Sequence, residues 1–149
     1  RQAVSIFEPE VRSNEVRITQ DERGLVVSLA SDAFFETASA ELNIEASRDV
    51  FIKLSELLQS DAVADRKFRI EGHTDNIPTA PGGEWETNWE LSTARSLSVL
   101  RLLRDYGVPE ERFQVMGVAD TVPLVSNDTA EGRAYNRRVD VIILTEGHL

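Results

Sequence analysis

The sequence predicts an α+β protein, a two-layer sandwich in which a mixed sheet of about four strands carries two main helices on one face. Two observations lead to this expectation. Short runs rich in β-branched residues alternate with two long segments whose apolar residues recur every three or four positions. The order strand, helix, strand, helix, strand, with one extra antiparallel strand, then gives one sheet covered by both helices. At 149 residues the chain has the size of one domain.

The strands are expected where apolar runs lie between turn residues, at residues 25–29, 68–72, 113–116 and 139–144. Val16 and Ile18 alternate with polar neighbours and indicate a weaker strand, followed by a turn signal at 21–24. We therefore expect residues 1–23 to be an N-terminal linker or an extra strand region. Residues 24–146 are expected to form the domain and residues 147–149 a tail.

The two main helices are expected at residues 41–58 and 87–106. The first has an apolar stripe at helical spacing, formed by Val50, Phe51, Leu54, Leu57 and Leu58. Thr87 and Glu90 open the second helix with the spacing of a capping box, and Gly107 follows its end. The loop at 74–86 contains two prolines and a glycine pair, so it cannot be regular. A short helical turn is expected from Thr129.

The composition narrows the classes of function. The net charge of −10 argues against a nucleic-acid partner, because phosphate binding needs a concentrated positive surface. The chain has no cysteine, which excludes disulfides, cysteine-based zinc sites and a thiol nucleophile. No run approaches the roughly 20 apolar residues that cross a bilayer. Because the chain starts at Arg1 rather than Met, we expect a fragment, and any anchor or export signal would lie upstream of it.

Arg95 is the most informative residue, because it falls within the apolar stripe of the second predicted helix. A guanidinium is costly to bury without a partner. Asp75 follows the predicted strand at 68–72, and the loop that carries it leads to the mouth of the same helix. The two charges indicate either an internal salt bridge or a site for a zwitterion, with Asp75 binding an ammonium and Arg95 a carboxylate. The residues alone leave both alternatives open.

No metal or cofactor is expected. His73 and His148 are too few and too far apart for a metal site, and His73 is expected to make a structural hydrogen bond at a strand end. A hydrolase with two catalytic carboxylates is a weaker alternative. An arginine near Asp75 would lower the pKa of that acid, which is the wrong direction for a general acid.

Three runs, at residues 70–76, 88–95 and 127–139, resemble the motifs of the OmpA-like peptidoglycan-binding domain, in the same order and with compatible spacing. The resemblance covers most of the chain and implies the OmpA-like type of sandwich. It also implies that Asp75 and Arg95 hold the diaminopimelate residue of the cell-wall stem peptide. Asn136 and Arg137 match a further asparagine–arginine element. The peptidoglycan-binding residues that the resemblance implies are Thr74, Asp75, Asn88, Leu91, Arg95, Asn136 and Arg137.

Within that family, the sequence of residues 74–92 is most similar to flagellar stator proteins of the MotB type. The stretch at 35–42 is also similar to theirs, with Ala38 where glycine is usual. This likeness implies a non-catalytic, periplasmic domain of an inner-membrane protein that anchors the stator to peptidoglycan. It further implies a homodimer and a MotA-like membrane partner, reached through a transmembrane segment that this chain lacks. The alternative is the anchor domain of another envelope protein, such as an outer-membrane OmpA/Pal-like protein or a type VI secretion component.

Overall fold

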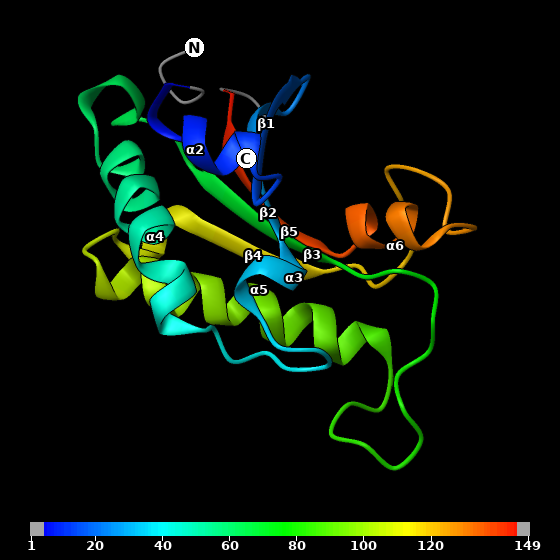
Figure 1. Ribbon diagram of the computed structural model, residues 1–149. Coiled ribbons are helices and arrows are strands. Elements are labelled where there is room, and N and C mark those ends of the chain that lie inside the picture. Colours follow the sequence, from blue (N-terminus) through cyan, green and yellow to red (C-terminus); the bar gives the residue numbers. More distant parts are fainter. Residues whose placement is uncertain (1–4, 146–149) are drawn as a thin grey trace.

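The computed structural model describes residues 5–145, which form one sheet with its main helices on one side (Figure 1). The strand order is β1-β2-β5-β3-β4. Only β3 and β4 run parallel to each other, and the other neighbours are antiparallel. The mixed α+β sandwich expected from the sequence is confirmed. The strands are β1 (Val16–Asp21), β2 (Gly24–Ala30), β3 (Phe68–His73), β4 (Phe113–Gly117) and β5 (Arg138–Leu144).

The sheet has five strands rather than about four, because residues 16–21, whose apolar pattern is weak, form an edge strand. β1 pairs with β2 along its whole length, from Val16 opposite Leu29 to Asp21 opposite Gly24. An edge strand needs apolar residues on one face only, which explains its faint signal. The predicted boundary between residues 23 and 24 therefore falls in the turn of a hairpin. The predicted tail at 147–149 and residues 1–4 lie outside the described residues.

The helices begin where side chains cap them. Helix α4 starts three residues later than expected, because the side chain of Asn43 accepts a hydrogen bond from the Ala46 amide at 3.1 Å. The expected capping box of α5 is present. The side chain of Thr87 accepts from the backbone amide of Glu90, and the side chain of Glu90 accepts from the backbone amide of Thr87. The helical turn expected from Thr129 is α6. The helices are α2 (Glu8–Arg12), α3 (Ser31–Phe34), α4 (Ile44–Leu58), α5 (Asn88–Asp105) and α6 (Ala130–Asn136), with 3-10 turns at Asp61–Val63 and Glu110–Arg112.

The core lies between the sheet and the helices α4 and α5 (Figure 1). All five residues of the predicted α4 stripe are buried. Phe68 and Ile70 of β3 and Val99 of α5 belong to the same buried cluster. No helix within residues 5–145 combines the length and the apolarity that would be needed to cross a membrane.

Gly72 sets how closely α5 lies against the end of β3. A Cβ atom at this position would lie only 2.1 Å from the carbonyl oxygen of Ser92 on α5. The absent side chain therefore lets the helix backbone approach the strand directly. This contact places the first turns of α5 beside the loop that leaves β3.

Candidate functional site

A cleft of about 670 Å³ opens where the chain leaves β3. Its walls are the loop at 74–80, the α3 region at residues 32–38 and the first turns of α5. Segment 35–43, drawn in cyan, runs beside α5 in Figure 1. Six of the seven site residues expected from the sequence line this cleft: Thr74, Asp75, Asn88, Leu91, Arg95 and Arg137.

Asp75 is almost fully buried at the base of the cleft, with 7% of its surface exposed. Its Oδ1 accepts a hydrogen bond from the Ile77 amide at 3.0 Å. Its Oδ2 accepts one from Nη1 of Arg137 at 2.6 Å. A carboxylate offers about four acceptor positions, so two remain for a ligand.

Arg95 is also buried, with 5% of its surface exposed. Its hydrogen bonds go to the backbone of the segment at residues 36–39 rather than to Asp75. Its Nε donates to the Ser39 carbonyl at 2.7 Å and its Nη2 to the Glu36 carbonyl at 3.2 Å. The guanidinium also lies 5.0 Å from the centre of the Phe35 ring. Burial lowers the pKa of Arg95 to about 10, which leaves it charged at neutral pH.

The internal salt bridge that the sequence left open is therefore absent: within residues 5–145 no ion pair joins Asp75 to Arg95. Both charges face one cleft without neutralising each other. Arg95 has five N–H donors, of which backbone carbonyls take two. Three donors remain available to a ligand carboxylate.

Arg137 bridges two carboxylates across the cleft. Its Nε and Nη2 donate to the two oxygens of Asp32 at 3.0 and 2.8 Å, while its Nη1 reaches Asp75. Asp32, followed by Asp75, raises the pKa of Arg137 above its ordinary value. Sequence reasoning missed Asp32. The signal that could have found it is the antiparallel pairing of β2 with β5, which places Ala30 opposite Arg138.

The remaining lining residues shape the cleft. Asn88 donates from Nδ2 to the Ile77 carbonyl at 3.0 Å, which ties the loop to the start of α5. Thr74 donates from Oγ1 to the Asp75 carbonyl at 2.8 Å. Leu91, 7% exposed, provides an apolar wall.

Asn136 does not line the cleft, although the sequence placed it among the site residues. Its side chain is fully buried and forms four hydrogen bonds with the neighbouring loop. Oδ1 accepts from the amides of Leu124 and Val125, and Nδ2 donates to the Val125 carbonyl and to Asn127. Asn136 therefore holds the loop before α6 and has no donor or acceptor directed at the cleft.

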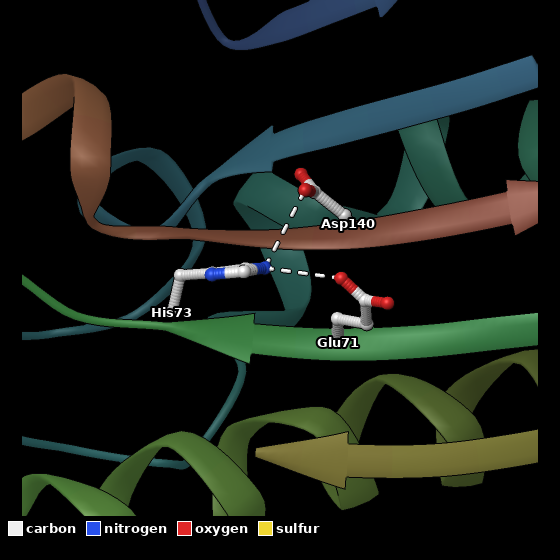
Figure 2. A group of neighbouring side chains, drawn as sticks. All are labelled: Glu71, His73 and Asp140. Carbon is white, nitrogen blue, oxygen red and sulfur yellow. Dashed lines mark hydrogen bonds and ion pairs between the residues drawn. The ribbon is translucent and has the colours of Figure 1, made fainter. Parts of the chain in front are cut away.

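Glu71, His73 and Asp140 gather on the sheet face away from α5 and could be mistaken for a metal site (Figure 2). His73 Nε2 lies 3.3 Å from Glu71 Oε1 and 3.6 Å from Asp140 Oδ2. Arginines already neutralise both carboxylates, since Arg23 bonds Glu71 and Arg138 bonds Asp140. A bound cation would meet two guanidiniums. We interpret the cluster as a buried ion-pair network that holds β3 against β5.

The pKa of Glu71 reflects this network. Burial alone would raise it, but the hydrogen bond from His73 and the charge of Arg23 outweigh burial and hold the pKa below its usual range.

Arg137 and Arg138 point to opposite faces of the sheet, so only Arg137 reaches the cleft.

A five-stranded mixed sheet with its main helices on one side and a charged cleft beside α5 define this α+β domain. The sequence matches the OmpA family over residues 34–137, and the chain belongs to this family. It is 35% identical to Motility protein B of Bacillus subtilis (strain 168) over 136 residues, which cover 89% of this chain. The same match covers 49% of the Bacillus protein, so the chain spans about half the length of that relative.

Two solved structures are similar over nearly the whole chain. A putative MotB like protein from Desulfovibrio vulgaris superposes with a TM-score of 0.86 at 25% identity, covering 97% of this chain and 90% of that one. The cell wall anchor of the T6SS from Pseudomonas aeruginosa has a TM-score of 0.83 at 29% identity, with 96% of each chain covered. Both likenesses extend to the segment before residue 24.

Proposed function

We propose that this domain binds peptidoglycan without cutting it, and that it anchors a flagellar stator protein of the MotB type to the cell wall. The ligand is the free end of the diaminopimelate residue in the stem peptide. One observation carries the proposal: Asp75 and Arg95 line the same cleft, both buried, and do not bond each other.

The chemistry of the cleft suits an amino acid end. A ligand ammonium donates to the open acceptor positions of Asp75, and the adjoining carboxylate accepts from the remaining N–H groups of Arg95. Leu91 and the apolar part of the loop at 77–80 contact the aliphatic chain between the two ends of diaminopimelate. Charges held by the backbone need little rearrangement on binding, which favours affinity.

A hydrolase is the less favoured alternative, since cleavage of the glycan needs a carboxylic acid with a raised pKa beside a second carboxylate. Arg137 donates hydrogen bonds to both Asp75 and Asp32, so a guanidinium lies directly against each of these two carboxylates. Glu84 and Glu86 lie exposed in the 74–87 loop and are outside the cleft.

The similarity to Motility protein B supports the wider assignment. We propose a periplasmic location, an inner-membrane anchor upstream, a homodimer and a MotA-like membrane partner. Co-purification of the full-length protein with a four-span membrane protein tests the last two. Recovery of a monomer with no such partner would contradict this part of the proposal.

A cosedimentation assay with purified peptidoglycan tests wall binding. We expect wild type to sediment with the wall and Asp75→Asn to stay in the supernatant, because the carboxylate that meets the ammonium is lost. Asp21→Asn is the matched control, because Asp21 also binds an arginine but lies outside the cleft. Equal sedimentation of all three proteins would refute the site, and release of soluble wall fragments would favour the hydrolase.

The similarity to the P. aeruginosa anchor supports a second candidate, a wall anchor of a type VI secretion system. Both candidates use the same cleft, so wall binding cannot separate them. Deletion of the gene separates them: loss of swimming with normal secretion supports the stator, and the reverse supports the secretion anchor.

A further inference from the structure

Asp75, Arg137 and Asp32 form a row of contacts in the cleft in which the charges alternate in sign, and Arg95 lines the same cleft. Arg137 contacts both carboxylates directly. Asp32 also acts on Arg95, where it is the strongest of the charges that oppose the lowering of the pKa by burial. The charge of Asp32 therefore acts on both guanidiniums, but its direct contact is with Arg137.

Asp32 holds the guanidinium of Arg137 by a two-point contact, called the fork below. Both carboxylate oxygens accept, one from Nε and one from Nη2, and this two-point contact fixes the plane of the guanidinium. The third nitrogen, Nη1, is thereby directed at Asp75. The side chain of Asp32 is 56% exposed and that of Asp75 10% exposed, so an accessible acid positions an arginine on a buried one.

The fork also sets the charge that a ligand meets. Asp75 and Arg137 alone form a neutral pair, which attracts an ammonium weakly. Asp32 adds one negative charge beside the pair and keeps Arg137 partly compensated. Without Asp32, the Nε and Nη2 donors of Arg137 would be free to bind a ligand carboxylate.

We propose that Asp32 is a positioning residue that makes the cleft prefer a ligand end bearing both an ammonium and a carboxylate over an end bearing a carboxylate alone. This inference rests on the proposed binding of diaminopimelate and adds the group that sets its selectivity. Asp32 acts through Arg137.

The chain offers a matched control for the substitution. Asp21 binds Arg23 through two oxygens, and Arg23 in turn contacts the buried carboxylate of Glu71. The arrangement of Asp21, Arg23 and Glu71 thus repeats that of Asp32, Arg137 and Asp75, but away from the cleft. Asp32→Asn and Asp21→Asn remove the same charge from the same kind of contact.

Calorimetric titration with two probes tests the proposal. The probes are meso-diaminopimelate and pimelate, the same seven-carbon dicarboxylate without amino groups. We expect Asp32→Asn to weaken diaminopimelate binding roughly fivefold at low salt, and to leave pimelate binding unchanged or tighter. Asp21→Asn should change neither. Equal weakening of both probes, or equal effects of the two variants, would overturn the selectivity role.

A second measurement separates this inference from the proposed function. If wild type bound no diaminopimelate, the proposed function would fail. The contact between Asp32 and Arg137 can still be tested, by measuring hydrogen exchange of the Arg137 Nε–H proton in NMR spectra. Faster exchange in Asp32→Asn than in wild type and Asp21→Asn supports the fork, and an unchanged rate shows that Asp32 does not hold Arg137.

Discussion

Substitution of Gly72 by alanine should damage the fold and the cleft together. The new Cβ would lie 2.1 Å from the Ser92 carbonyl oxygen and 2.7 Å from Ser96 Oγ, while an ordinary contact begins at 3.4 Å. The oxygen belongs to the helix backbone and cannot rotate away. Helix α5 must therefore move off β3 by about 1 Å, and overpacking of this kind costs about 1–3 kcal/mol. For a chain of this size that is a fall in Tm of about 3–10 °C.

The same shift should weaken ligand binding. Leu91 and Arg95 move with α5, while Asp75 stays with the loop that leaves β3. A displacement of about 1 Å between two groups that grip one ligand removes much of the gain from preorganisation. We expect at least tenfold weaker diaminopimelate binding at a temperature where the variant is still folded.

Thermal unfolding followed by circular dichroism, with titration at 15 °C, measures both effects. Gly83→Ala is the control, because its nearest neighbour would be the Ala80 carbonyl oxygen at 3.2 Å, in an exposed loop. It should change the free energy of unfolding by less than about 0.5 kcal/mol. If Gly72→Ala kept the Tm and the affinity of wild type, the close helix–strand contact would not position the cleft.

Three further predictions concern stability. Ala38 has a φ of +58°, so Ala38→Gly should stabilise the protein by about 0.5–1 kcal/mol in urea unfolding, and a loss of stability would contradict the strain argument. Asn136→Ala should cost roughly 3 kcal/mol, because it leaves two loop amides without acceptors, yet retain the preference for diaminopimelate over pimelate. Because the pKa of Glu71 is lowered by folding, the stability it contributes is complete above its unfolded value of about 4.5 and is lost as the pH falls through the folded value. The difference in unfolding free energy between wild type and Glu71→Gln should shrink over that acid range, and a difference independent of pH would show that Glu71 is not held by its partners.

Periodicity in the sequence was enough to find the layers of this fold. The two helical stripes and four of the strands produce strong local patterns, and the observed elements begin and end close to the predicted positions. Helix α4 begins later than predicted because its cap, Asn43, lies inside the segment predicted to be helical. The fifth strand, β1, has a weak pattern because an edge strand buries one face only.

The site was only partly predictable, for a physical reason. Asp75 and Arg95 stand out locally, one at a strand end and the other on an apolar stripe. Asp32 has no local peculiarity, and its role depends on a contact with Arg137 across 105 residues, which exists only once β2 and β5 have paired. Asn136 lies next to Arg137 in the chain but points into the loop before α6, and sequence adjacency does not reveal that difference.

A crystal structure of the domain with meso-diaminopimelate tests the central claim most directly. We expect the compound in the cleft beside α5, with one carboxylate within hydrogen-bonding distance of Arg95 and the adjoining ammonium on Asp75. A cleft left empty at saturating ligand, or a ligand seated with its ammonium away from Asp75, would contradict the account.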